Sequence, residues 1–315
     1  MEIAHTPVLL EEIIQYLAPR GRDELMIDAT MGEGGHSYAL LSRFSDLSIM
    51  GVDVDPSIQA VARSHLAEFG DRVSFFTGWA QDFFAGYPAG LRRPNTVLID
   101  LGISLFHYRT SGRGFGFSVD EPLDMRLEPS GGVSASELLM QMSEKDIADI
   151  LYRNSQERYS RRIARAIVEE RRRGAITTTA ALSELIYRAV PASYRHGPIH
   201  PATRTFMALR IEVNRELSRL PELLEGAFEA LEPGGRLGVI SFHSLEDRIV
   251  KDFFRTKSRD CTCPAQATKC TCAGRQANLL TRKGVTAGEA EVKRNSPSRS
   301  ARLRVAEKVK ERDTQ

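Results

Sequence analysis

The sequence predicts an α/β fold with a doubly wound, mostly parallel sheet and a helical insert. Short apolar strands alternate with segments of helical periodicity over the first hundred residues. Three of these strands lead into an acid, at Asp28, Asp53 and Asp100. Between about residue 109 and about residue 203 the pattern is helical, and the strand pattern resumes afterwards. We therefore expect a main domain of residues 1–108 and 204–315, interrupted by a helical insert of residues 109–203.

The elements of the N-terminal part each have a local reason. Apolar periodicity begins after Pro7, and another helix begins at Pro56, because proline suits the first turn of a helix. A short apolar run ending at Asp28 predicts the first strand, and a glycine turn separates it from the next helix. The expected helices are 8–17, 37–44 and 56–69, and the expected strands are 25–28, 48–52, 72–76 and 96–100.

The remaining elements follow from the same patterns. Four segments of apolar periodicity predict helices within the insert, and the turn at Glu232-Pro233-Gly234-Gly235 precedes a buried strand. A polar stretch follows the last predicted helix, and a closing strand lies near the end of the chain. The expected elements are helices at 135–142, 143–152, 159–173, 178–189, 206–217, 222–231 and 245–254, and strands at 236–242 and 301–306.

The loop after the first strand predicts a nucleoside site. Gly34 and Gly35 let the backbone approach a ligand closely, and Asp53 can accept hydrogen bonds from ribose hydroxyls. The loop lacks the G-x-G-x-x-G spacing that seats a pyrophosphate, and Asp28 would repel a phosphate. A ligand with an adenosine and a cationic centre fits better, and S-adenosylmethionine is such a ligand. The alternative is an ordinary turn between a strand and a helix.

Asp100 is a candidate catalytic residue. Ligands of parallel sheets lie outside the carboxyl ends of the strands, so Asp28, Asp53 and Asp100 should converge on one crevice. Within Asp100-Leu101-Gly102, the carboxylate could accept a hydrogen bond from an exocyclic amine and hold its nitrogen toward a methyl group. The alternative is a cap or turn residue.

A second candidate segment follows the strand 236–242. Ser244 and Asp247 resemble a helix-capping box, although Asp replaces the usual Glu or Gln. This structural explanation leaves His243 as a candidate substrate-side group.

The charge distribution predicts a polyanionic partner. The whole chain has a net charge of +2, but residues 251–315 carry 16 Lys and Arg against seven Asp and Glu. A second basic segment, residues 153–173, has eight Arg against three Glu. One basic run is usually a solvated helix face, but two of them beside a nucleoside site favour a nucleic acid.

Four cysteines form one cluster, Cys261-Thr262-Cys263 and Cys270-Thr271-Cys272. Zinc sites usually have two residues between paired cysteines, whereas each pair here has one. We expect reduced thiols and assign no metal ligand, with a structural zinc as the alternative. The N-terminus lacks the layout of a signal peptide, and no apolar run approaches the length of a membrane helix, so we expect a cytoplasmic location.

Longer motifs extend over nearly the whole chain. They are His5-Thr6-Pro7-Val8-Leu9-Leu10, Gly34-Gly35-His36-Ser37, Asp100-Leu101-Gly102, Arg113-Gly114-Phe115, Pro122-Leu123-Asp124-Met125-Arg126, Arg162-Ile163-Ala164-Arg165-Ala166-Ile167, His200-Pro201-Ala202-Thr203-Arg204-Thr205-Phe206, Ala208-Leu209-Arg210-Ile211-Glu212-Val213-Asn214 and Ser241-Phe242-His243-Ser244-Leu245-Glu246-Asp247. Together they closely resemble the bacterial small-subunit ribosomal RNA methyltransferases of the H type, also called the MraW family. Motifs of this length and number are far more specific than a glycine loop.

The resemblance implies a class I, Rossmann-like methyltransferase that depends on S-adenosylmethionine. It implies methylation of N4 of a cytidine in the decoding region of 16S rRNA, with the helical insert helping to bind RNA. It also implies a homodimer without membrane association. The small ribosomal subunit is the expected partner.

The resemblance also implies site residues. The cofactor-binding positions carried over are Gly34, Gly35, His36, Asp53, Ala80, Asp100 and His107. The chain departs from the family pattern at three positions: His107 replaces a glutamine, Ala80 stands where an aromatic residue commonly stacks on adenine, and Ala29 replaces the first loop glycine. Trp79 or Phe83 could supply the aromatic ring instead.

We expect direct methyl transfer, with Asp100 and Ser104 as the catalytic residues and no covalent adduct. Other readings are an amino methyltransferase acting on DNA or a small molecule, a nicotinamide oxidoreductase, and an RNA-binding assembly factor without catalysis. The loop spacing disfavours the oxidoreductase, and the basic insert disfavours a small substrate. The family usually reads Ser-Ser-Pro-Gln-Leu-Asp where this chain has Ser104-Leu105-Phe106-His107-Tyr108-Arg109, and this change keeps the assembly factor open.

Overall fold

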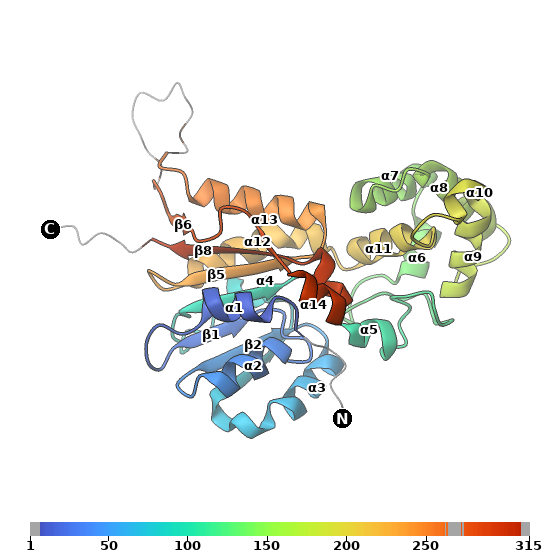
Figure 1. Cartoon of the computed structure of the whole chain (residues 1–315). Coiled ribbons are helices and arrows are strands. Elements are labelled where there is room, and N and C mark those ends of the chain that lie inside the picture. Colours follow the sequence, from blue (N-terminus) through green and yellow to red (C-terminus); the bar gives the residue numbers. More distant parts are fainter. Residues whose placement is uncertain (1–6, 262, 264–271, 273, 310–315) are drawn as a thin grey trace. The chain divides into compact units, whose positions relative to one another are not determined.

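The structure, a computed structural model, describes residues 7–261, 263, 272 and 274–309 of the 315-residue chain. The chain divides into two compact units (Figure 1). Unit 1 comprises Met1–Ile103 and Leu217–Gln315, and unit 2 comprises Ser104–Glu216. The described strands all belong to unit 1, and unit 2 is built from helices and loops.

Unit 1 is built on a sheet that has eight strands among the described residues, in the order β3-β2-β1-β4-β5-β8-β6 with β7 paired to β8. Neighbouring strands among β1 to β5 are parallel, whereas β8 is antiparallel to its three partners. This confirms the predicted fold class, an α/β doubly wound and mostly parallel sheet. The strands are β1 (Leu25–Asp28), β2 (Ser48–Asp53), β3 (Val73–Thr77), β4 (Thr96–Asp100), β5 (Arg236–Ser241), β6 (Ala277–Leu279), β7 (Val285–Thr286) and β8 (Arg302–Lys308).

Helices cover both faces of the sheet. Successive strand residues point to opposite faces, so neighbouring residues of one strand belong to different cores. Ile27 belongs to the core formed with α4, α12 and α13. Its neighbour Met26 belongs to the core formed with α1, α2 and α3. The helices of unit 1 are α1 (Leu10–Leu17), α2 (Gly35–Arg43), α3 (Pro56–His65), α4 (Ala80–Ala85), α12 (Glu216–Ala230, whose first residue belongs to unit 2), α13 (Ser244–Lys257) and α14 (Glu289–Arg294), with 3₁₀ turns η1 (Ala67–Arg72) and η2 (Ser296–Ser300).

The sheet has a switch point at β1. Strands β2 and β3 continue on one side of β1, and β4 and β5 continue on the other. Parallel sheets bind ligands at such a point, outside the carboxyl ends of the strands. Asp28 ends β1, and Asp53 and Asp100 end the strands on either side of it. The parallel pairing therefore sets the three acids at the same end of three adjacent strands.

Unit 2 is held together by buried polar contacts as well as by apolar packing. The side chain of Asn214 donates to the carbonyls of Met125 and Arg210 at 2.8 and 2.9 Å, and it accepts from the Leu127 N–H at 2.8 Å. Arg210 forms two 2.8 Å contacts with Glu216. The helices of unit 2 are α5 (Leu105–Arg109), α6 (Ala135–Gln141), α7 (Glu144–Ser155), α8 (Ser160–Arg171), α9 (Thr179–Ala189), α10 (Ala192–Arg195) and α11 (Ala202–Val213).

The predicted helices at 206–217 and 222–231 have wrong boundaries. Helix α11 already ends at Val213, and α12 begins at Glu216 and runs through Pro221. Proline removes one helical hydrogen bond, which usually ends a helix. Here Leu220, Leu223 and Leu224 are buried in the core, and this burial offsets the lost bond.

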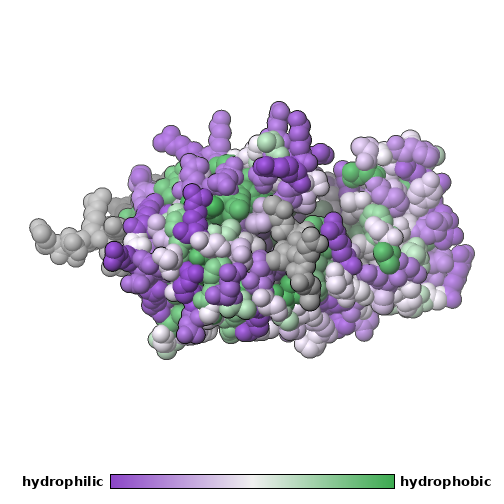
Figure 2. All heavy atoms as spheres, turned by 60° about the horizontal axis from the view of Figure 1, so that its bottom comes forward, coloured by the Kyte–Doolittle hydropathy of each residue, from purple (hydrophilic) through white to green (hydrophobic). Residues whose placement is uncertain are grey.

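The segment after α13 contains more structure than its polar sequence predicts, namely β6, β7 and α14. No helix among the described residues is long and apolar enough to cross a membrane. On the face drawn in Figure 2, hydrophilic side chains predominate, and hydrophobic ones lie between them.

We expect Asn214→Leu to lower the free energy of unfolding by at least about 2 kcal/mol, because it leaves a buried N–H and a buried carbonyl without partners. Urea denaturation, with hydrogen exchange to locate the opening within unit 2, measures the effect. Gln141→Ala, at an exposed position of α6, is the control. Equal unfolding midpoints for the two variants would contradict this assignment.

Candidate active site

The glycine loop between β1 and α2 is fixed by backbone geometry and by Asp53. Gly34 precedes α2 with a φ of 81°, which favours glycine, and a Cβ there would lie 2.9 Å from Leu66 Cδ1. The Asp53 carboxylate accepts from the Gly32 N–H at 2.8 Å and from the Asp55 N–H at 2.9 Å. The acid that the sequence assigns to a ribose thus also positions the loop.

Asp28 is buried at the end of β1. Its Oδ2 accepts a 2.7 Å hydrogen bond from Ser37 Oγ, in the first turn of α2. The pKa of Asp28 is raised to about 6, chiefly because the group is buried; hydrogen bonds from Ser37 and the Thr30 backbone lower it, and the nearby charge of Asp53 raises it. The carboxyl group therefore titrates near neutral pH, and it would favour a positive charge beside it.

Asp100 lies at the end of β4, and its backbone N–H donates to Thr30 Oγ1 at 2.6 Å. Its side chain is 19% exposed. Among the described residues, its buried Oδ1 has no hydrogen-bond partner. Burial raises the pKa of Asp100 well above its ordinary value, and the charges of Asp28 and Glu246 raise it further. The strand end therefore presents an unused acceptor among like charges.

His36 faces the same carboxyl group. Its Nε2 lies 2.9 Å from the carbonyl oxygen of Val8, which only accepts, so Nε2 carries the hydrogen. Its Nδ1 then points toward Asp100, 3.6 Å from Oδ2. The ring is buried, and the motif of residues 5–10 thus contributes a backbone acceptor that orients His36 against Asp100.

His243 caps the N-terminus of α13, a role that the sequence assigned to the neighbouring Ser244. Its ring accepts from the Glu246 N–H, while the buried Glu246 carboxylate accepts from the backbone N–H groups of Phe242 and His243 at 2.8 and 3.3 Å. The predicted Ser244–Asp247 box is therefore wrong by one residue, because the bonding partners are His243 and Glu246. Asp247 instead pairs with Arg304 at 2.7 Å.

The aromatic candidates differ in burial. Phe83 is buried in the core against Phe76, Phe84 and Tyr87, which makes it part of the packing. Ala80 begins α4 and is also buried. Trp79 is partly exposed, and the guanidinium carbon of Arg219 lies 3.7 Å from its ring centroid. Of the two rings considered from the sequence, Trp79 is the one outside the core.

Ser104 and His107 belong to unit 2. Ser104 caps α5, where its Oγ accepts from the Phe106 N–H at 3.1 Å. His107 is buried within that helix, and its ring contacts Phe106 and Phe115 edge-on. Gly34, Gly35, His36, Asp53 and Asp100 lie around the strand ends of unit 1.

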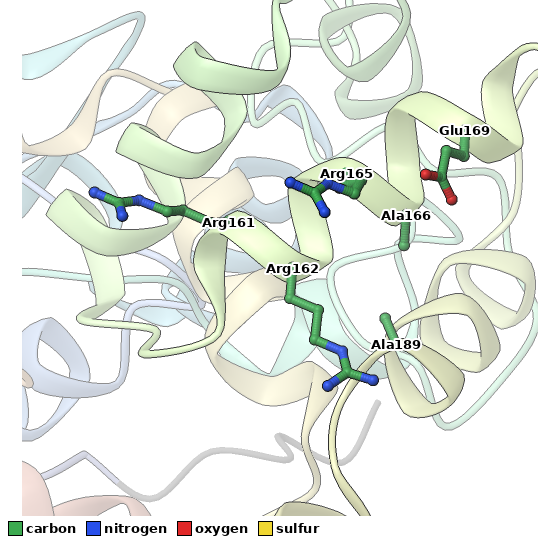
Figure 3. Close-up of a pocket in the computed structure, with 6 residues that line it drawn as sticks. All are labelled: Arg161, Arg162, Arg165, Ala166, Glu169 and Ala189. Atoms are coloured by element: carbon green, nitrogen blue, oxygen red, sulfur yellow. The ribbon is translucent and has the colours of Figure 1, made fainter.

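The basic segment of the insert forms an exposed face of α8. Arg161, Arg162 and Arg165 line a pocket of about 540 Å³ together with Glu169 and Ala189, and their guanidinium groups extend away from the helix (Figure 3). Arg165 lies 3.6 Å from Glu144, and both side chains are largely exposed. An ion pair of this kind is weak, so Arg165 can exchange Glu144 for a phosphate.

Two residues of the site had little signal in the sequence. Thr30 positions the backbone of Asp100, and the Glu246 charge acts on the Asp100 carboxyl group. The segment 241–247, which contains Glu246, was singled out from the sequence, but its predicted capping box was Ser244 and Asp247. Asp100 and Glu246 are far apart in the chain, so the sequence did not show that they lie close together in space.

The chain matches the model of the MraW methylase family over residues 2–309. It is 53% identical to "Ribosomal RNA small subunit methyltransferase H" of Treponema denticola, over the full length of both chains. Proteins of the same name from Heliobacterium mobile and Treponema pallidum are 44% and 42% identical, over 98% and 97% of this chain and 100% and 93% of theirs. A solved rRNA methylase from Streptococcus thermophilus is similar with a TM-score of 0.44 and 10% identity, over 98% of this chain and 100% of that chain.

The assignment rests on the sequence matches, which extend from the glycine loop through the helical unit to the last strand. The chain therefore belongs to the MraW methylase family, and it is a methyltransferase.

Proposed function

We propose that this protein transfers a methyl group from S-adenosylmethionine to the exocyclic N4 of a cytidine in the decoding region of 16S rRNA. The main support for an amine as the methyl acceptor is Oδ1 of Asp100, which is buried without a hydrogen-bond partner among the described residues and could accept a hydrogen bond from an amine. The name shared by relatives that are 42–53% identical over nearly the whole chain supports the ribosomal substrate.

The residues of unit 1 fit a cationic nucleoside. Bound S-adenosylmethionine supplies an electrophilic methyl group on a positively charged sulfur. Asp28, Asp100 and Glu246 lie close together, and a cation bound between them would reduce the repulsion between their negative charges. Asp53 would hold the ribose, and the loop at Gly34 and Gly35 would hold the amino-acid part of the cofactor.

Asp100 would act on the substrate amine. The N4 lone pair is delocalised into the cytosine ring, so alignment must provide much of the rate, and alignment is worth about 7–11 kcal/mol in favourable cases. Oδ1 would accept a hydrogen bond from N4 and take its proton as the new N–C bond forms. His36, held by the Val8 carbonyl, would fix the orientation of Asp100. We also propose Ser104 as a contact to the base, and Ala80 and His107 as cofactor contacts.

The RNA must supply an unstacked cytosine, because a stacked base cannot reach a catalytic carboxylate. We propose that the insert, residues 109–203, is the RNA-recognition domain and that residues 1–108 and 204–315 form the methyltransferase domain. The arginine face of α8 would bind phosphates. We also propose that the protein is a homodimer and that it is located in the cytoplasm, where small ribosomal subunits occur.

Incubating small ribosomal subunits with labelled S-adenosylmethionine tests the function. We expect one labelled cytidine in 16S rRNA, with the methyl group on N4 by mass spectrometry. Asp100→Asn should lower the rate by about 10²-fold or more, because the variant cannot take the N4 proton. Asp71→Asn, at an exposed position, is the matched control. Label on protein, on another RNA atom or on nothing would refute the proposal.

We expect Asp53→Ala to weaken S-adenosylmethionine binding at least about tenfold in calorimetry, because a charge-assisted hydrogen bond is worth about 1.5–3 kcal/mol. Asp53 also holds the loop, so a 2′-deoxyribose analogue separates the two roles. The wild type should prefer the ribose form, and the variant should not distinguish them. Asp46→Ala is the control, and a variant that retains the ribose preference would contradict the assignment.

Cofactor binding should depend on pH. The raised pKa values mean that Asp28 and Asp100 take up protons in the empty site, and a sulfonium favours their ionised forms. Affinity for S-adenosylmethionine should therefore rise with pH through about 6, by up to about tenfold per unit for each proton released. The other ionisable groups that face these two carboxyl groups are His36, Asp53 and Glu246.

S-adenosylhomocysteine is the matched control ligand, because it lacks the sulfonium charge. Its affinity should change much less between pH 5 and pH 7. Calorimetry in buffers of different ionisation enthalpy counts the protons released, and Asp28→Asn should release fewer. Identical pH profiles for the two ligands would rule out the charge argument.

A further inference from the structure

We propose that Cys261, Cys263 and Cys272 bind a zinc ion that closes the loop between α13 and β6. Their three sulfur atoms lie within 4.8 Å of one another. The Sγ atoms of Cys261 and Cys272 are 3.7 Å apart. Zinc–thiolate bonds of about 2.3 Å in tetrahedral geometry set two sulfurs about 3.8 Å apart, so this pair already has the spacing of two ligands.

The chain brings these cysteines together by pairing the two ends of the loop. The N–H of Gln276, just before β6, donates to the carbonyl of Lys257, the last residue of α13, at 2.8 Å. One step farther out, the Arg275 guanidinium forms two contacts with the Asp260 carboxylate, at 2.9 and 3.2 Å. Cys261 and Cys272 form the next pair outward. The hydrogen bonds between the end of α13 and the start of β6 thus bring these two cysteines together.

The geometry favours a metal over the other states of a cysteine cluster. A disulfide needs sulfurs about 2.05 Å apart, well below the observed spacing. Thiolate ligands disfavour hard cations such as magnesium and calcium and suit zinc, and these three sulfurs lie within 4.8 Å of one another. In the sequence, zinc was disfavoured because only one residue separates Cys261 from Cys263. The sequence did not show that the sulfur of Cys272 lies close to those of Cys261 and Cys263.

The three described cysteines account for three of the four positions of tetrahedral zinc. Cys270, the remaining cysteine of the predicted cluster, lies outside the described residues. A zinc ion here would join the end of α13 to the start of β6, an edge strand of the sheet. The site is separate from the strand ends that carry Asp28 and Asp100, so its failure would leave the proposed methyl transfer untouched.

Metal analysis of the full-length protein tests this proposal. We expect about one zinc per chain after purification without chelators, and cobalt reconstitution should give the visible bands of tetrahedral cobalt thiolates. Cys261→Ser and Cys272→Ser should each lose most of the bound metal. Ser258→Ala, at the base of the same loop, is the control and should retain it.

A second measurement covers the case in which a serine variant fails to fold. Removing the metal from the wild type with a chelator should raise hydrogen exchange at the end of α13 and in β6, and adding zinc chloride should restore protection. Metal content unchanged in both serine variants, no metal uptake by the wild type, or an intact mass two hydrogens below that of the reduced chain would each overturn the proposal.

Discussion

The mutual repulsion of buried carboxyl groups at neighbouring strand ends is the constraint on which the site depends. Parallel pairing sets Asp28 and Asp100 at the same end of β1 and β4, and α13 adds the charge of Glu246. Desolvation and like charge raise the pKa of each aspartate, so these two carboxyl groups hold their protons more tightly than water-exposed acids do. Such an arrangement lowers folding stability, and the sulfonium of the proposed cofactor would offset that effect.

The same residues serve the scaffold and the site. Asp53 fixes the Gly32 N–H, Ser37 joins α2 to Asp28, and Thr30 holds the backbone of Asp100. Because these contacts link the loop and the first turn of α2 to the three strand ends, the loop cannot move without disturbing the acids. Rigidity of this kind suits a reaction that depends on alignment, since small displacements of the reacting groups reduce the rate strongly.

The sequence predicted the sheet and the acids because both follow from local patterns: β1 and β4 were predicted at their observed bounds, and the other predicted strands lie within two residues of theirs. It missed β6 and β7, since strands of three and two residues have no measurable periodicity. It misplaced the start of α12, where tertiary burial outweighs Pro221. The sequence could not predict the His36–Asp100 contact or the effect of the Glu246 charge on Asp100, because both depend on the spatial proximity of segments far apart in the chain.

The raised pKa of Asp100 also fits the direction of the proposed reaction. While the sulfonium is bound, its charge favours the ionised carboxylate, which can accept a hydrogen bond from N4. In the proposed reaction, methyl transfer would remove that positive charge, and N4 would lose a proton in the same process. The Asp100 carboxyl group would thus regain its high proton affinity when a proton becomes available. Burial therefore gives Asp100 a high proton affinity, which a bound sulfonium would lower and the transfer would restore.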